Sequence, residues 1–134
     1  MKSNGFTIIE IIVVLVIAGV LAATAAPKFS NLFSNSPFSI DAATSLIESD
    51  IRYVQELAMA THQPKTMGFS QGSSSYYLPD SSEPRDLQGV TLDNNLTATF
   101  NSFGEPIAGG GQPLSVGGTK TVSITAYTGK VVVQ

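Results

Sequence analysis

The stretch that decides the fold is Gly5-Phe6-Thr7-Ile8-Ile9-Glu10, which leads into an almost wholly apolar run that ends at Ala26, directly before Pro27. From Phe6 to Ala26 there are 21 residues, and a helix of that length measures about 31 Å, the thickness of the hydrocarbon core of a membrane. β-branched residues dominate the run and form helices poorly in water, but in lipid a helix is the only single-segment structure that satisfies every backbone group. The run therefore predicts a membrane helix over residues 6–27.

Glu10 distinguishes this run from a simpler apolar segment. From the residues alone, three interpretations are open: a secretory signal peptide cut near Ala23–Ala26, a plain membrane anchor, and a segment in which Glu10 has a function. A carboxylate inside an apolar span is energetically unfavourable and usually functional, whereas a signal peptide has no use for one. Lys2 is the only basic residue before Lys28, and this weak bias places the N-terminus in the cytoplasm.

The segment Gly5–Glu10, with the apolar run and Pro27 behind it, resembles the class III signal of type IV prepilins and type II secretion pseudopilins. The resemblance implies that residues 1–5 are a leader. It also implies that prepilin peptidase cuts after Gly5 and then methylates the amino group of Phe6, so that the apolar helix stays attached to the mature chain.

The same resemblance gives roles to three positions within the apolar helix. Glu10 is implied to pair with the amino terminus of a neighbouring subunit, because a lone carboxylate and a lone ammonium are both unfavourable in apolar surroundings. Gly19 and Pro27 are implied to mark a kink in a helix that continues beyond them. The open alternative is a helix that ends at Ala26.

Composition separates the two parts of the chain. The 134 residues suffice for one modest domain, and every acidic residue except Glu10 lies at or beyond Asp41. The net charge of −3 provides no general attraction to nucleic acid, and only Lys120 and Lys130 are basic in the region where some family members bind DNA. The chain has no cysteine, which excludes disulfides and thiolate metal sites.

An amphipathic helix is predicted within residues 28–62. A break or kink is expected near Asn35–Pro37, since proline disfavours helix in the residue before it. The helical period then predicts a continuous helix over residues 40–62, with Ser39 or Asp41 as its N-cap. One apolar stripe is expected to pack on a sheet: Ala43, Ile47, Ile51, Val54 and Ala58, with Leu46 and Leu57 beside it. The polar residues expected to face away are Glu48, Arg52, Gln55 and Glu56.

Residues 63–134 change to short β-type runs separated by turn residues, which predicts an antiparallel sheet. The glycine-rich segment Gly104–Gly118 is expected to be a long loop that is mobile or contacts a partner. The candidate strands are Thr66–Phe69, Ser75–Leu78, Val90–Leu92, Leu96–Phe100 and a closing hairpin of Thr121–Ala126 and Lys130–Val133.

The order of lipid helix, amphipathic helix and antiparallel sheet resembles the GspH/FimT group of minor pseudopilins and minor pilins over most of the chain. The segments that carry this resemblance are Leu46–Ala58, Phe100–Pro106 and Val122–Val131, while Ala25–Phe29 resembles pilins of the mannose-sensitive haemagglutinin type. The implied class is α+β with the pilin fold, in which a long N-terminal hydrophobic helix continues into an amphipathic helix packed on a C-terminal antiparallel β-sheet.

No set of side chains has catalytic spacing, so the protein is expected not to be an enzyme, and no cofactor or metal is expected. His62, the single histidine, ends the predicted second helix as a solvated or capping residue, and the serines lack an accompanying base. Asp93-Asn94-Asn95 offers oxygen atoms of the kind that Ca²⁺ prefers, but a plain turn is the better interpretation.

The resemblance implies a structural subunit, expected to be a minor one, of a type II secretion pseudopilus or a type IV pilus. Its partners would be other pilin or pseudopilin subunits, prepilin peptidase, an assembly platform in the inner membrane, and lipid before assembly, with nucleic acid not favoured. The chain would cross the bacterial inner membrane once, with its C-terminal domain in the periplasm, and then enter a periplasmic or cell-surface filament. Two alternatives stay open: an anchored periplasmic binding domain that does not polymerise, and a minor pilin for DNA uptake.

Overall fold

A computed structural model describes the backbone of residues 7–33 and 37–134, and the side chains of residues 7–23 and 39–134. The predicted leader, residues 1–5, lies outside the described part of the chain.

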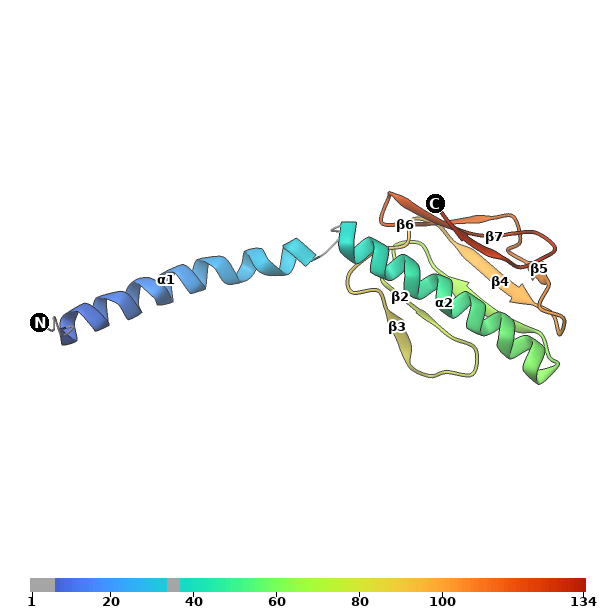
Figure 1. The fold of residues 1–134 in the computed structure, drawn as a ribbon, viewed down its shortest axis with the longest axis horizontal. Helices are drawn as coiled ribbons and strands as arrows, with labels where there is room; N and C mark the ends of the chain where they lie inside the picture. Colours follow the sequence, from blue (N-terminus) through green and yellow to red (C-terminus); the bar gives the residue numbers. More distant parts are fainter. Residues whose placement is uncertain (1–6, 34–36) are drawn as a thin grey trace, which may run out of the picture. The chain divides into compact units, whose positions relative to one another are not determined.

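The chain divides into two compact units, Met1–Phe33 and Ser34–Gln134. The described part of the first unit is one helix, α1 (Ile8–Phe33), and the second unit contains α2 (Pro37–Thr61) and strands β1 to β8 (Figure 1). Residues 34–36, which include most of the predicted break, lie outside the described residues.

Helix α1 runs without interruption through Gly19 and Pro27 to Phe33. The alternative of a helix that ends at Ala26 is therefore wrong. A kink at Gly19 and Pro27 stays a prediction.

Helix α2 begins three residues before its predicted start. Proline suits this position because the first N–H groups of a helix have no intrahelical partner, so Pro37 loses nothing there. Ser39 and Asp41 consequently lie inside the helix, and the prediction that one of them is the N-cap is wrong. The helix ends at Thr61, and the exposed His62 follows in the left-handed conformation with φ of 54°. The predicted stripe is confirmed, since all five of its members are buried: Ala43, Ile47, Ile51, Val54 and Ala58.

Two antiparallel sheets, rather than one, pack against α2 (Figure 1). The first has the strand order β3-β2-β1-β4-β5 and the second the order β6-β7-β8, and a single bridge between Leu92 and Val116 connects the region before β4 to β6. The strands are β1 (Lys65–Phe69), β2 (Ser75–Tyr77), β3 (Pro84–Asp86), β4 (Leu96–Phe100), β5 (Pro106–Ala108), β6 (Pro113–Val116), β7 (Lys120–Ile124) and β8 (Val131–Val133).

Two sequence predictions about the β-region are wrong. The segment Gly104–Gly118 is not a long loop, because it contains β5 and β6, each of which begins with a proline at the edge of its sheet. Val90–Leu92 is not a strand: Val90 and Leu92 are buried, but the segment has only the bridge at Leu92. The predicted closing hairpin is confirmed as β7 and β8, with the first strand ending at Ile124.

Gln55 was expected to face away from the core, and this prediction is also wrong. Its amide nitrogen Nε2 donates to the backbone oxygen of Gly104 at 2.7 Å and lies 3.4 Å from the backbone oxygen of Thr128. One side chain of α2 therefore holds both the β4–β5 turn and the β7–β8 turn against the helix.

Candidate functional site

The predicted site residues at the start of the chain are only partly within the described residues. Gly5 and Phe6, the predicted cleavage and methylation positions, lie outside them. Glu10 lies in the first turn of α1, with Gly19 and Pro27 further along the same helix.

Thr7 fixes where α1 begins. Its side-chain oxygen Oγ1 accepts a hydrogen bond from the backbone N–H of Glu10 at 3.3 Å, and its backbone oxygen accepts one from Ile11 at 3.2 Å. Thr7 is therefore an N-cap, and Glu10 occupies the third helical position, where an acid interacts favourably with the positive end of the helix dipole. A threonine followed by an acid three residues later, here Thr7 and Glu10, is a sequence signal from which this helix start could be predicted.

Between Ile8 and Ala23, where the side chains of α1 are described, apolar side chains are exposed on every side of the helix. The exposed fractions are 79% for Ile8, 66% for Leu15 and 62% for Leu21. Gly19 likewise has no heavy atom from elsewhere in the chain within 4 Å of the place that a Cβ would take. A continuous apolar surface of this kind usually contacts either lipid or another protein.

Glu10 stands at a shallow apolar hollow on this helix, which it shares with Ile11, Val14 and Leu15. The carboxylate is the one charged group among the described side chains of α1, residues 8–23. If apolar surroundings covered the helix, the carboxylate would need a cationic or hydrogen-bonding partner from another molecule.

Within the described residues, no helix combines the length and the apolar character that crossing a membrane requires.

A buried polar network joins α2 to the first sheet. Asp50 is buried, and its Oδ2 atom accepts a hydrogen bond from the hydroxyl of Tyr76 at 2.8 Å and lies 3.2 Å from Nε of Arg85. Burial, followed by the hydrogen bond to Asp50, raises the pKa of Tyr76 well above its ordinary value. The network attaches β2 and β3 to the helix. It was predictable in part, because Asp50 lies three residues after Ile47 and four before Val54 on the buried stripe.

A groove of about 640 Å³ opens beside this network, between α2 and the segment that links β2 to β3. Tyr53 and Leu57 line it from the helix, and Leu78 and Pro79 line it from the segment after β2.

The three residues that offered oxygen atoms for Ca²⁺ have structural partners instead. Among Asp93, Asn94 and Asn95, each side chain accepts a backbone N–H, from Gly118, Ser115 and Gln71 respectively. These bonds support the interpretation of this segment as a turn. In the described part of the chain, no three acidic or histidine side chains cluster in a way that would hold a metal ion.

Comparison with known proteins shows what the chain resembles. Residues 1–26 match the prokaryotic N-terminal methylation motif. The chain is 28% identical over 127 residues to PilA5 of Thermus thermophilus, a type IV narrow pilus major component, and the match covers 93% of this chain and 98% of that protein. No solved structure matches the chain. Three findings agree: the methylation motif, the likeness to a pilin over most of the chain, and the packing of α2 on antiparallel sheets. The chain is a type IV pilin-like protein with an α+β fold.

Proposed function

We propose that this protein is a structural subunit of a type IV pilus, which is stored in a membrane through α1 and then assembled by packing α1 against the same helix of neighbouring subunits. The observation that carries the proposal is the apolar surface of α1, which is exposed on all sides over residues 8–23 and contains the carboxylate of Glu10. Such a surface is unfavourable in water, and either lipid or a bundle of identical helices would bury it.

The proposed maturation follows from the methylation motif at residues 1–26. Prepilin peptidase cuts after Gly5, removes the leader at residues 1–5 and methylates Phe6. Residues 6–27 then form the membrane and assembly helix, which crosses the bacterial inner membrane once and leaves the C-terminal domain in the periplasm. An assembly platform in the inner membrane transfers the mature subunit to the filament.

Glu10 has the central role in the proposed assembly. The freed amino group at Phe6 is a cation, and its partner must come from another subunit once lipid is left behind. Pairing with Glu10 of a neighbour neutralises both charges and fixes the axial step between subunits, since any other step would leave two charges buried without partners.

A pilus is favoured over a type II secretion pseudopilus by the relative from Thermus thermophilus. That protein is named as a major pilus component, and it corresponds to this chain over almost the full length of both. This relationship also favours a major subunit over the minor subunit that the sequence analysis expected. Binding of nucleic acid is not part of the proposal, because the described acidic side chains of the second unit outnumber the basic ones.

The experiment that tests the proposal is the substitution Glu10→Ala in cells that carry the pilus genes. We expect cleavage after Gly5 to proceed as in the wild type, while the amount of the variant in sheared filaments falls sharply. Glu56→Ala, which removes an exposed acid of α2, is the matched control and should leave assembly unchanged. Filaments of normal abundance built from the Glu10→Ala variant would contradict the role of Glu10.

A further inference from the structure

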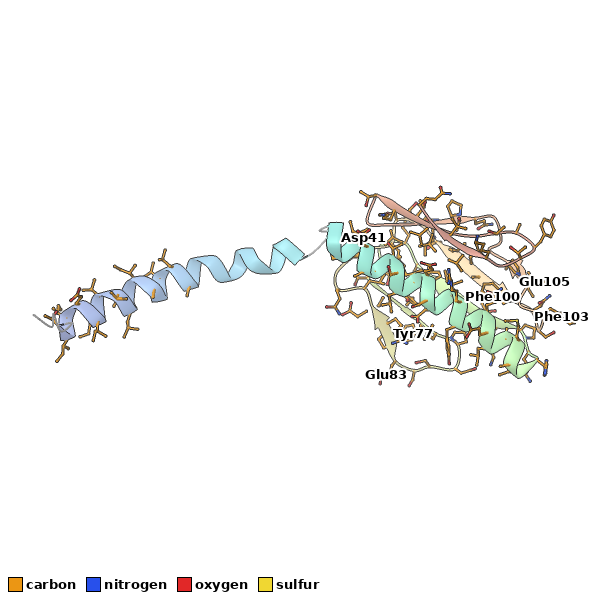
Figure 2. All side chains as sticks on the ribbon, viewed as in Figure 1. Asp41, Tyr77, Glu83, Phe100, Phe103 and Glu105 are labelled. Atoms are coloured by element: carbon orange, nitrogen blue, oxygen red, sulfur yellow. The ribbon has the colours of Figure 1, made fainter. Side chains whose placement is uncertain are left out.

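Two aromatic side chains project from neighbouring turns at the end of the second unit where α2 ends. Phe103 in the β4–β5 turn is 80% exposed and Tyr127 in the β7–β8 turn is 88% exposed, and Figure 2 shows Phe103 beside Glu105 at this end. The amide of Gln55 holds both turns through the backbone oxygens of Gly104 and Thr128. We call Phe103 and Tyr127 the aromatic tip.

The turns that display the aromatic tip are tightly packed. Gly104 and Gly129 both have positive φ, of 79° and 69°. A Cβ at Gly129 would lie 2.8 Å from the backbone oxygen of Gly104 and 2.5 Å from Nε2 of Gln55, so no side chain fits between the turns and the helix. Because the backbone of the two turns is held in place, binding a partner costs little backbone entropy there.

The groove beside Asp50 and Arg85 is a concave surface that could receive the aromatic tip. Its apolar walls come from Leu57, Leu78 and Pro79, with the half-exposed ring of Tyr53 at one side. The polar part of the lining comes from Ser49, Asp50, Asp80, Ser81 and Arg85. A concave surface that combines apolar walls with polar groups can receive an aromatic side chain at a protein interface.

Charges of opposite sign without an ion pair lie near the two surfaces. Two other charges there already have partners: Glu105 beside Phe103 accepts a hydrogen bond from Asn101, and Arg85 in the groove pairs with Asp50. Lys130 follows the β7–β8 turn and is exposed, and it is the one lysine or arginine among the described side chains without an ion pair to another described residue. The segment around β3, next to the groove, carries Glu83 and Asp86, which are exposed and have no ion pair within the described residues. Complementary charges of this kind steer association and fix its register.

We propose that the aromatic tip of one copy of this chain docks into the groove of a second copy, with Lys130 of the first copy facing Glu83 of the second. The proposal rests on the proposed function, because a filament needs a contact between two different surfaces of the same molecule. A contact that pairs a projection with a groove elsewhere on the surface joins two different surfaces, and contacts of this kind build a helical array when the rotation between copies does not close into a ring.

Cysteine cross-linking in assembled filaments tests this contact, because the chain has no cysteine of its own. The test variant carries Ser81→Cys at the groove and Thr128→Cys beside Tyr127. The control variant carries Ser81→Cys and Thr119→Cys, which is also an exposed threonine but lies in the β6–β7 turn near the start of α2. After mild oxidation, we expect a ladder of covalent multimers from the test variant and none from the control.

Each outcome bears on a different claim. Three results would overturn the proposed contact: a ladder from the control alone, equal ladders from both variants, or no ladder from either. None of them bears on whether the filament itself forms. Absence of filaments from wild-type cells would overturn the proposed function and the contact together.

A charge exchange gives a second test that needs no oxidation. Lys130→Glu is expected to lower the yield of sheared filaments several-fold, and adding Glu83→Lys to the same chain is expected to restore it. If the double variant assembles no better than Lys130→Glu alone, the proposed pairing is wrong.

Discussion

Replacing Tyr76 with phenylalanine isolates the contribution of the buried polar network. The variant keeps the aromatic contact with Phe69, whose ring centroid lies 4.9 Å away, and removes only the hydroxyl that donates to Asp50. A hydrogen bond to a charged group contributes about 1.5–3 kcal/mol, and the carboxylate left behind is buried. We therefore expect Tyr76→Phe to lower the free energy of unfolding by about 2 kcal/mol. In a domain of about 100 residues, that loss lowers Tm by roughly 10 °C.

The neighbouring tyrosine is the matched control. Tyr77 lies on the same strand but is 57% exposed, because successive side chains of a strand point to opposite faces. Tyr77→Phe should change the free energy of unfolding by less than about 0.5 kcal/mol. The measurement is urea unfolding of the full-length protein in mild detergent, followed by circular dichroism. Equal losses for Tyr76→Phe and Tyr77→Phe, or no loss for Tyr76→Phe, would refute the account of the network.

Two further predictions concern the same domain. The folded state raises the pKa of Tyr76 above its ordinary value of about 10, so the unfolded chain releases this proton first as pH rises. The free energy of unfolding should therefore decline above about pH 10. Tm measured against pH tests this, and the decline should be shallower in Tyr76→Phe. Gly129→Ala should reduce the free energy of unfolding by at least about 1 kcal/mol more than Gly118→Ala. Both positions have positive φ, but only a Cβ at Gly129 would come within 2.8 Å of the backbone oxygen of Gly104. Urea unfolding of the two alanine variants tests this, and similar losses would contradict it.

The helical elements were predictable because their patterns are long. The apolar run behind Glu10 continues for enough residues to require a helix in any apolar surrounding, and the stripe from Ala43 to Ala58 repeats with the helical period over four turns. The closing hairpin was predictable from the two β-type runs on either side of Gly129, which supplies the positive φ that its turn requires.

The glycine-rich segment between Gly104 and Gly118 was not predictable in the same way. Its strands β5 and β6 have three and four residues, too few for a period of two to be recognised. Their pairing depends on β4 and β7, which lie elsewhere in the chain, so tertiary contacts rather than local sequence decide their structure.

The polar contacts of α2 were missed for a related reason. An acid or an amide on a helix is expected to face water. That expectation fails here because a strand brings Tyr76 beside Asp50 and a turn brings Gly104 beside Gln55. Asp50 and Gln55 nevertheless lie at helical positions next to the buried stripe, and that spacing is a signal from which their contacts could be predicted.

The intact mass of the protein recovered from sheared filaments shows directly whether α1 is retained in the assembled subunit. We expect a chain that has lost residues 1–5, begins at Phe6 and carries one additional methyl group on its amino terminus. A chain that still begins at Met1, or one trimmed after Ala26 so that the apolar helix is gone, would contradict the identification of α1 as the retained assembly helix of a filament subunit.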